Sequence, residues 1–222
     1  MDNLTHKECE FTDPLRTLPV ECVLFVIEQI AALHTGTWGM KQEDYHWITP
    51  DYGQLILGLM RTYDARIGAD DGPAVLDYLR DQRGAVAVLG TYYKTRNPKF
   101  QCLLRGDVHT GNVYLTPDGS PNFVGFQIMY ISSAFHDLAY FVGGALIVED
   151  RRAHENDIID HYLKSLAGFG GPTMERDEEV MAEYIHPFLS TFSWVVATYS
   201  TQAKERHSKY FERSLDYRIS QM

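Results

Sequence analysis

Long apolar runs are missing from this sequence, because none approaches the roughly 18 residues that indicate a membrane-spanning helix. The first residues, MDNLTHKECEF, lack the basic and apolar segments of a secretory signal. Basic residues are also scarce: 20 Lys and Arg stand against 30 Asp and Glu, a net charge of −10. Nucleic-acid binders and proteins that dock on anionic membranes need basic surfaces. We therefore predict a cytoplasmic protein with no nucleic-acid and no membrane partner.

Cysteine is rare as well, with only Cys9, Cys22 and Cys102 in the chain. An odd number without a Cys-x-x-Cys pair predicts reduced thiols and excludes a disulfide scaffold. The clustered ligands of a zinc site and the His-Glu-x-x-His motif are absent, and no cofactor motif occurs. The sequence thus predicts neither a metal ion nor a cofactor. What is present is a hydrophobic content of 45%, with 13% aromatic residues, enough to build a core.

Hydrophobic periodicity and turn residues indicate an α+β protein that is mostly helical. The expected helices are 19–34, 55–66, 73–82, 135–146, 149–167 and 176–204, the last divided by Pro187. Between them, 103–115 and 122–129 are expected to be extended and joined by a hairpin across Pro117-Asp118-Gly119-Ser120. The apolar segment 85–89 is too short to classify. We expect one domain, 1–222, with a small β-hairpin insertion.

One loop carries the chemistry, the stretch LLRGDVHTGNVYL from Leu103 to Leu115. Asp107 and Asn112 have the Asp-x-x-x-x-Asn spacing of a kinase catalytic loop. In phosphoryl transfer, a carboxylate orients the attacking hydroxyl, and an amide oxygen a few residues later helps to hold magnesium. Alone this pattern is weak, but here apolar segments flank it and glycines lie inside it.

A longer stretch, from Leu104 to Leu146, resembles the core of the aminoglycoside-phosphotransferase and choline-kinase-like superfamily. That superfamily reads roughly HGDxHxGN, a short hairpin, an apolar-Asp-Trp segment and a D-L-A-Y/F helix. The helix 19–34 and Thr37-Trp38 are similar to its "LHA…W" segment, and fungal members with "DWQ…SAFHDVAYF" are most similar. The resemblance implies the large lobe of a kinase-like fold, with a catalytic-loop-like region at 103–127 and acceptor-site helices at about 133–222.

The sequence departs from that pattern in three places. Gly125 stands where the superfamily has its metal-binding aspartate, and glycine offers no side-chain oxygen to magnesium. Arg105 replaces the histidine of the HGD motif. No glycine-rich loop and no Val-Ala-x-Lys strand lies upstream of Asp107, so we expect the small lobe to be absent.

Two interpretations of the loop remain open. In the functional one, Asp107 and His109 are catalytic, as acid/base groups or polar anchors, and Arg105, Asn112 and Gln127 bind substrate. In the structural one, the Asx side chains only tie the loop to neighbouring backbone. Three further roles are expected: Asp137 braces the loop, His34 caps its helix, and the later aromatics pack in the core. If they line the acceptor site instead, those aromatics would suit a hydrophobic substrate.

Three functions follow from these patterns. The leading one is a degenerate kinase-fold protein that acts on a small organic molecule without ATP. Its reaction would be a cyclisation, isomerisation or dehydration, because such chemistry needs only positioning and proton transfer. The resemblance to fungal members implies a setting in fungal secondary metabolism. The second is a non-catalytic pseudokinase that binds a metabolite or a protein partner. The third is an ATP-dependent phosphotransferase completed by a partner chain. The apolar surface left by the absent lobe would be covered either by the N-terminal segment or by a homodimer.

Overall fold

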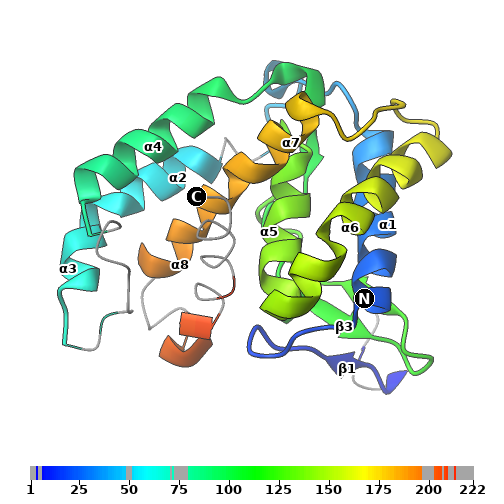
Figure 1. Cartoon of the computed structure of the whole chain (residues 1–222), viewed down its shortest axis with the longest axis horizontal. Coiled ribbons are helices and arrows are strands. Elements are labelled where there is room, and N and C mark those ends of the chain that lie inside the picture. The colour runs from blue at the N-terminus through cyan, green and yellow to red at the C-terminus, as the bar shows by residue number, and fades with distance from the viewer. Residues whose placement is uncertain are drawn as a thin grey trace.

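Helices make up most of the chain, and two small antiparallel sheets stand beside them (Figure 1). This computed structural model describes residues 4, 7–48, 52–70, 72, 80–196, 203–206, 208, 209 and 213. The predicted class, α+β and mostly helical, is confirmed. The helices are α1 (Val20–Gly36), α2 (Tyr52–Leu59), α3 (Tyr63–Ile67), α4 (Gln82–Thr95), α5 (Phe135–Ala145), α6 (Val148–Gly168), α7 (Glu178–Ile185) and α8 (Phe192–Val196). None of these described helices is long and apolar enough to cross a membrane.

The two sheets flank the loop that holds the Asp-x-x-x-x-Asn pattern, called the patterned loop below, which runs between β2 and β3. One has the order β1 (Glu10–Phe11), β3 (Val113–Leu115), β4 (Pro121–Phe123), and the other pairs β2 (Gln101–Leu104) with β5 (Tyr130–Ser133). The predicted hairpin is confirmed, since β3 pairs antiparallel with β4 and the Thr116 N–H donates to the Ser120 carbonyl at 2.9 Å. Gly119 completes this turn at φ +83°, a conformation that favours glycine.

The main core surrounds α5, in which every residue is buried. Helix α1 turns its Val23, Ile27 and Ile30 face toward α5 and α6, as its periodicity predicted. In Figure 1, α5 lies between α1 and α6 on one side and the α7–α8 segment on the other. A second cluster joins α2, α3, α4 and α8 through Ile56, Tyr63 and Leu89. The fully buried helix α5 therefore packs against the patterned loop.

Several predicted boundaries need correction. The unclassified segment 85–89 lies inside α4, which extends three residues before it and six residues after it. Within 122–129 only the first two residues are in a strand, and the strand Tyr130–Ser133 was not predicted. Most of the predicted helix 73–82 lies outside the described residues. In the segment 176–204, helix α7 begins at Glu178, and a 3₁₀ helix, η7 (His186–Thr191), follows it from His186, one residue before Pro187. Residues 197–202 are outside the description.

Candidate functional site

The patterned loop begins where β2 ends and is fixed from behind by Asp137 of α5. The Arg105 and Gly106 N–H groups donate to the two oxygens of this carboxylate at 2.7 and 3.0 Å. Asp137 is fully buried, and charged acceptors make the stronger class of hydrogen bond. Its predicted bracing role is confirmed.

Two histidines flank the same carboxylate. His34 Nε2 lies 3.4 Å from Asp137 Oδ2, and His136 Nδ1 lies 4.0 Å from Asp137 Oδ1. Burial would raise the pKa of Asp137, but its interactions with His136 and His34 outweigh burial and hold the pKa well below its usual range. The prediction that His34 caps its helix was wrong: it is buried, and its Nδ1 also contacts the Tyr162 hydroxyl at 2.8 Å.

Gly106 is required at the bend of the loop. Its φ of +83° lies in the left-handed region, and a Cβ there would stand 2.3 Å from the Ile128 carbonyl oxygen. Because that oxygen belongs to the backbone, no rotamer change would relieve the clash. The glycine lets the loop pass directly against the segment that leads into β5.

Asp107, His109 and Asn112 form one hydrogen-bonded cluster. The Asn112 side-chain amide donates to the Asp107 carbonyl at 2.8 Å and to Asp107 Oδ2 at 3.0 Å. His109 Nδ1 accepts from the Gly111 N–H at 3.0 Å, so a neutral ring carries its proton on Nε2, which lies 3.6 Å from Asp107 Oδ2. Both ring nitrogens of His109 therefore face the loop itself, and its ring packs edge-on against Trp194 at 5.4 Å.

The Asp107 carboxylate remains partly accessible, with a side chain 24% exposed. Burial would raise its pKa, but the interactions with His109, Asn112 and Arg105 together lower it. Within the described residues, the contacts from Asn112 and His109 reach Oδ2 of this carboxylate. At neutral pH this group is an ionised hydrogen-bond acceptor.

Arg105 lies almost completely buried behind this cluster. Its guanidinium donates to the Asp107 carbonyl at 3.1 Å and to the Gly125 carbonyl at 3.0 Å. It lies over the rings of Phe123 and Phe126, at 4.3 and 4.8 Å. Burial lowers its pKa to about 10, although Asp137 and Asp107 act in the opposite direction. These contacts join two loops of the protein, so a substrate-binding role for Arg105 stays a prediction without geometric support.

Gly125 stands opposite Asn112 and Gln127. A Cβ at position 125 would lie 3.0 Å from Asn112 Oδ1 and 3.4 Å from Gln127 Oε1. The two amide oxygens thus face the place that a side chain from position 125 would fill. The structure brings Asn112 and Gln127 to one site, as predicted, and Gln127 is exposed there.

This place does not fit the magnesium ion that a kinase-like fold implies. Magnesium binds proteins through carboxylates, and two neutral amide oxygens supply no charge to hold a dication. Glycine at 125 offers no side-chain oxygen, and the Asp107 carboxylate already bonds Asn112 through Oδ2. In the part of the chain that the structure describes, no three His, Cys, Asp or Glu side chains gather as a metal site would need.

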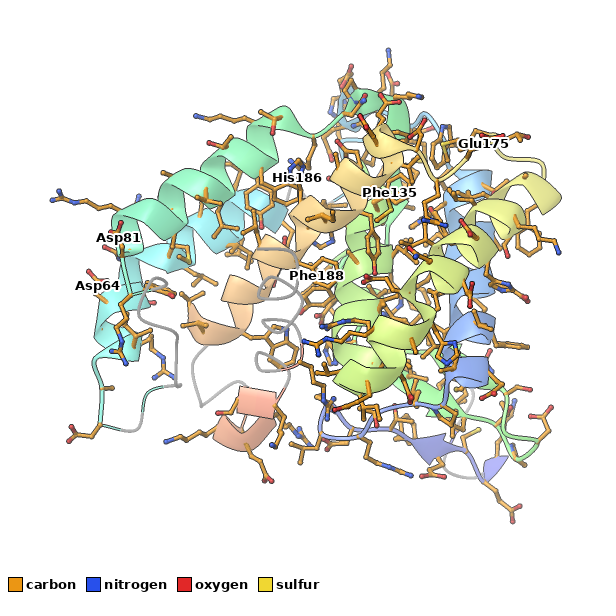
Figure 2. All side chains as sticks on the ribbon, in the orientation of Figure 1. Asp64, Asp81, Phe135, Glu175, His186 and Phe188 are labelled. Atoms are coloured by element: carbon orange, nitrogen blue, oxygen red, sulfur yellow. The ribbon has the colours of Figure 1, made fainter. Side chains whose placement is uncertain are left out.

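Aromatic residues pack around the loop. Trp194 and Phe188 are buried, and Figure 2 shows Phe188 directed toward α5, which confirms core packing for these two. Sequence reasoning missed Tyr52 at the start of α2, whose pKa is raised by burial and by the negative charge of Asp107. It also missed Phe126, half-exposed over Arg105. No motif marks Tyr52, which reaches the site from a separate segment, whereas Phe126 lies between Gly125 and Gln127 in the segment already matched to the superfamily.

The fold and the loop together define a kinase-like protein. Solved structures with a similar fold include choline kinase LicA from Streptococcus pneumoniae (12% identity, TM-score 0.53, 96% of this chain and 68% of that one). Ethanolamine kinase from Plasmodium vivax is also similar (12% identity, TM-score 0.56, 99% of this chain and 63% of that one). So is a microcompartment-associated aminopropanol kinase (14% identity, TM-score 0.54, 93% of this chain and 64% of that one). The chain spans about two thirds of the length of these kinases.

A family model gives the narrower assignment. The ecdysteroid kinase-like family matches residues 1–169, and the chain belongs to this family. A comparison with curated proteins found no match. The predicted resemblance to the choline-kinase-like superfamily is therefore confirmed.

Proposed function

We propose that this chain binds a small, hydroxyl-bearing organic molecule at Asp107 and does not itself transfer phosphate. The observation that carries the proposal is Gly125, which places no carboxylate beside the Asn112 and Gln127 amide oxygens to help them hold a metal ion. A phosphoryl-transfer site needs charge to hold the metal and neutralise the phosphates. The acceptor half of such a site, by contrast, needs only an oriented carboxylate.

Asp107 supplies that carboxylate. Its contacts hold Oδ2, so Oδ1 is the atom that a ligand hydroxyl would approach. A general base works best when its pKa lies near the working pH. The lowered pKa of Asp107 therefore supports binding more than proton abstraction.

The contacts of His109 also favour binding over catalysis. Its Nδ1 accepts from the Gly111 N–H and its Nε2 faces Asp107 and Asn112, so neither nitrogen is directed to an outside group. A cofactor-independent cyclase or isomerase would need an acid or base aimed at its substrate. Among the functions considered from the sequence, non-catalytic binding of a metabolite thus has the best geometric support.

Ligand binding without nucleotide tests the proposal. The probes are hydroxyl-bearing molecules suggested by the family and by the similar structures: an ecdysteroid, choline, ethanolamine and aminopropanol. Titration calorimetry without ATP and without magnesium is expected to detect at least one of them. Asp107→Asn is expected to weaken that binding about tenfold, because a hydrogen bond to a charged acceptor contributes about 1.5–3 kcal/mol and one to a neutral amide oxygen only about 0.5–1.5 kcal/mol.

Asp118→Asn is the matched control, since Asp118 is an exposed aspartate of the β3–β4 turn and should leave affinity unchanged. Equal binding by both variants would remove Asp107 from the site. Binding that appears only with ATP and magnesium would favour the phosphotransferase instead.

A further inference from the structure

Two oxygen acceptors face the place beside Gly125, which does not fit magnesium. A Cβ at position 125 would stand 3.0 Å from Asn112 Oδ1 and 3.4 Å from Gln127 Oε1. Neither oxygen accepts a hydrogen bond from the residues that the structure describes. Acceptors that converge without a donor favour a ligand group with several N–H bonds and disfavour a phosphate or a carboxylate.

Asn112 fixes the first of these acceptors. Its Nδ2 donates to the Asp107 carbonyl at 2.8 Å and to Asp107 Oδ2 at 3.0 Å. Exchanging the two amide atoms would set an oxygen against those two oxygens, so Oδ1 is the atom directed to position 125. Asn112 is only half-buried, and its Oδ1 keeps solvent-accessible surface. A ligand can therefore reach this oxygen from outside.

Gln127 supplies the second acceptor from the segment that follows Gly125. Its side chain is exposed and forms no hydrogen bond within the described part of the chain. It can therefore turn its oxygen toward a ligand without breaking a hydrogen bond to a described residue. Gly125 keeps the place between the two amides open, because it has no side chain to fill it.

The charges around this place favour a ligand with one positive charge rather than two. Arg105 contributes one positive charge, since its guanidinium donates to the Gly125 carbonyl at 3.0 Å. The Asp107 and Asp137 carboxylates both oppose the lowering of the pKa of this guanidinium by burial. When histidine is counted as neutral, two negative charges therefore surround one positive charge. A monovalent cation would balance the remaining negative charge, whereas a dication would leave an uncompensated positive charge in a partly buried site.

We propose that the place beside Gly125 binds a primary ammonium group where a kinase-like fold holds magnesium. Such a group carries one charge and three N–H donors, and Asn112 Oδ1 and Gln127 Oε1 would accept two of them. A quaternary ammonium has no N–H bond, and proteins bind it in cages of aromatic rings. The ligand class is therefore a primary amine.

This inference deepens the proposed function and rests on it for the second contact of the ligand. The Asn112 amide contacts Asp107 with its nitrogen and faces position 125 with its oxygen, so the two binding points are neighbours. A short molecule would place its hydroxyl at Asp107 and its ammonium beside Gly125.

Three probes with the same number of heavy atoms separate the two contacts: 3-aminopropanol, 1-butanol and butylamine. Saturation-transfer NMR on the full chain, at neutral pH and without magnesium or nucleotide, measures their dissociation constants. We expect 3-aminopropanol to bind about tenfold more tightly than 1-butanol, because only the ammonium makes charge-assisted hydrogen bonds. The trimethylated form of 3-aminopropanol should lose this advantage, because it keeps the charge but has no N–H bond.

Two variants of Gln127 test the acceptor. Gln127→Leu keeps the approximate size of the side chain and should reduce the preference for 3-aminopropanol over 1-butanol to about threefold or less. Gln127→Glu should raise the affinity for 3-aminopropanol, because a carboxylate is a stronger acceptor for an ammonium, and a merely structural role of Gln127 predicts no gain. Gln54→Leu is the matched control, because Gln54 is exposed on α2 and should keep the wild-type preference.

Equal affinities of the wild type for 3-aminopropanol and 1-butanol would overturn the proposal, and so would equal effects of Gln127→Leu and Gln54→Leu. Displacement of 3-aminopropanol by millimolar magnesium chloride, but not by potassium chloride of the same ionic strength, would also overturn it, because the place would then hold the metal. Failure of the proposed function gives a different result. Butylamine would then bind as tightly as 3-aminopropanol, which would remove the hydroxyl contact with Asp107 and leave the ammonium site standing.

Discussion

Replacing Asp137 by asparagine tests how the loop is held. Asp137 accepts from the Arg105 and Gly106 N–H groups at 2.7 and 3.0 Å and has no exposed surface. Asparagine keeps one oxygen but turns an NH₂ group toward one of these donors. One buried N–H therefore loses its acceptor, which costs about 1–3 kcal/mol, and the remaining bond loses its charge. We expect the free energy of unfolding to fall by about 3 kcal/mol.

Urea denaturation at pH 7, followed by far-UV circular dichroism, measures this loss. The matched control is Asp160→Asn, because Asp160 pairs with Arg176 on the surface with a side chain 53% exposed. Such surface pairs contribute less than about 1 kcal/mol. A loss below about 1 kcal/mol in Asp137→Asn, or equal losses in both variants, would refute the bracing role.

The pH dependence provides a second readout of the same variant. A carboxyl group whose folded pKa is depressed stabilises the protein fully above its unfolded pKa of about 3.9. As the pH falls below that value, the contribution is lost by about 1.4 kcal/mol per pH unit. Because the pKa of Asp137 is lowered in the folded chain, Asp137→Asn should flatten the acid limb of the stability curve below about pH 4. If the free energy of unfolding of Asp137→Asn fell with pH below about pH 4 as steeply as that of the wild type, the lowered pKa of Asp137 would be contradicted.

Two more substitutions test the core and a helix cap. Ile27→Ala, on the buried face of α1, should cost about 3 kcal/mol in urea denaturation because it leaves a cavity in the main core; a cost under about 1 kcal/mol would mean that α1 packs otherwise. Asp177→Ala removes the acceptor of the Val180 N–H at 2.9 Å at the start of α7. It should cost about 1 kcal/mol and lower the melting temperature by a few degrees; an unchanged melting curve would exclude the cap.

The helices that pack by one regular face were predictable from the sequence. The apolar spacing predicted a helix over 19–34, and α1 spans Val20–Gly36. The prediction succeeds because the spacing of apolar residues along the chain determines which face of a helix is buried. Strand β5 was missed because its partner β2 lies far away in the chain, and the segment Tyr130–Ser133 is buried on both sides without alternation. Segment 85–89 was ambiguous because α4 extends well beyond it.

The candidate site was predictable where a spacing or a resemblance fixes it. Asp107 and Asn112 lie together as their spacing indicates, and Asp137 braces the loop as the resemblance implies. The contacts of Arg105 were not predictable, because the Gly125 carbonyl and the Phe126 ring belong to a segment about 20 residues away. His34 seemed a helix cap by its position, but tertiary packing buries it against Asp137.

The most direct test of the account is a calorimetric titration of the wild-type chain with magnesium and ATP. Position 125 places no carboxylate beside the Asn112 and Gln127 amide oxygens to help hold magnesium. We therefore expect no saturable binding of magnesium and ATP up to millimolar nucleotide. Saturable binding below that concentration, with transfer of phosphate to a hydroxyl-bearing probe, would contradict the claim that this chain binds its ligand without phosphorylating it.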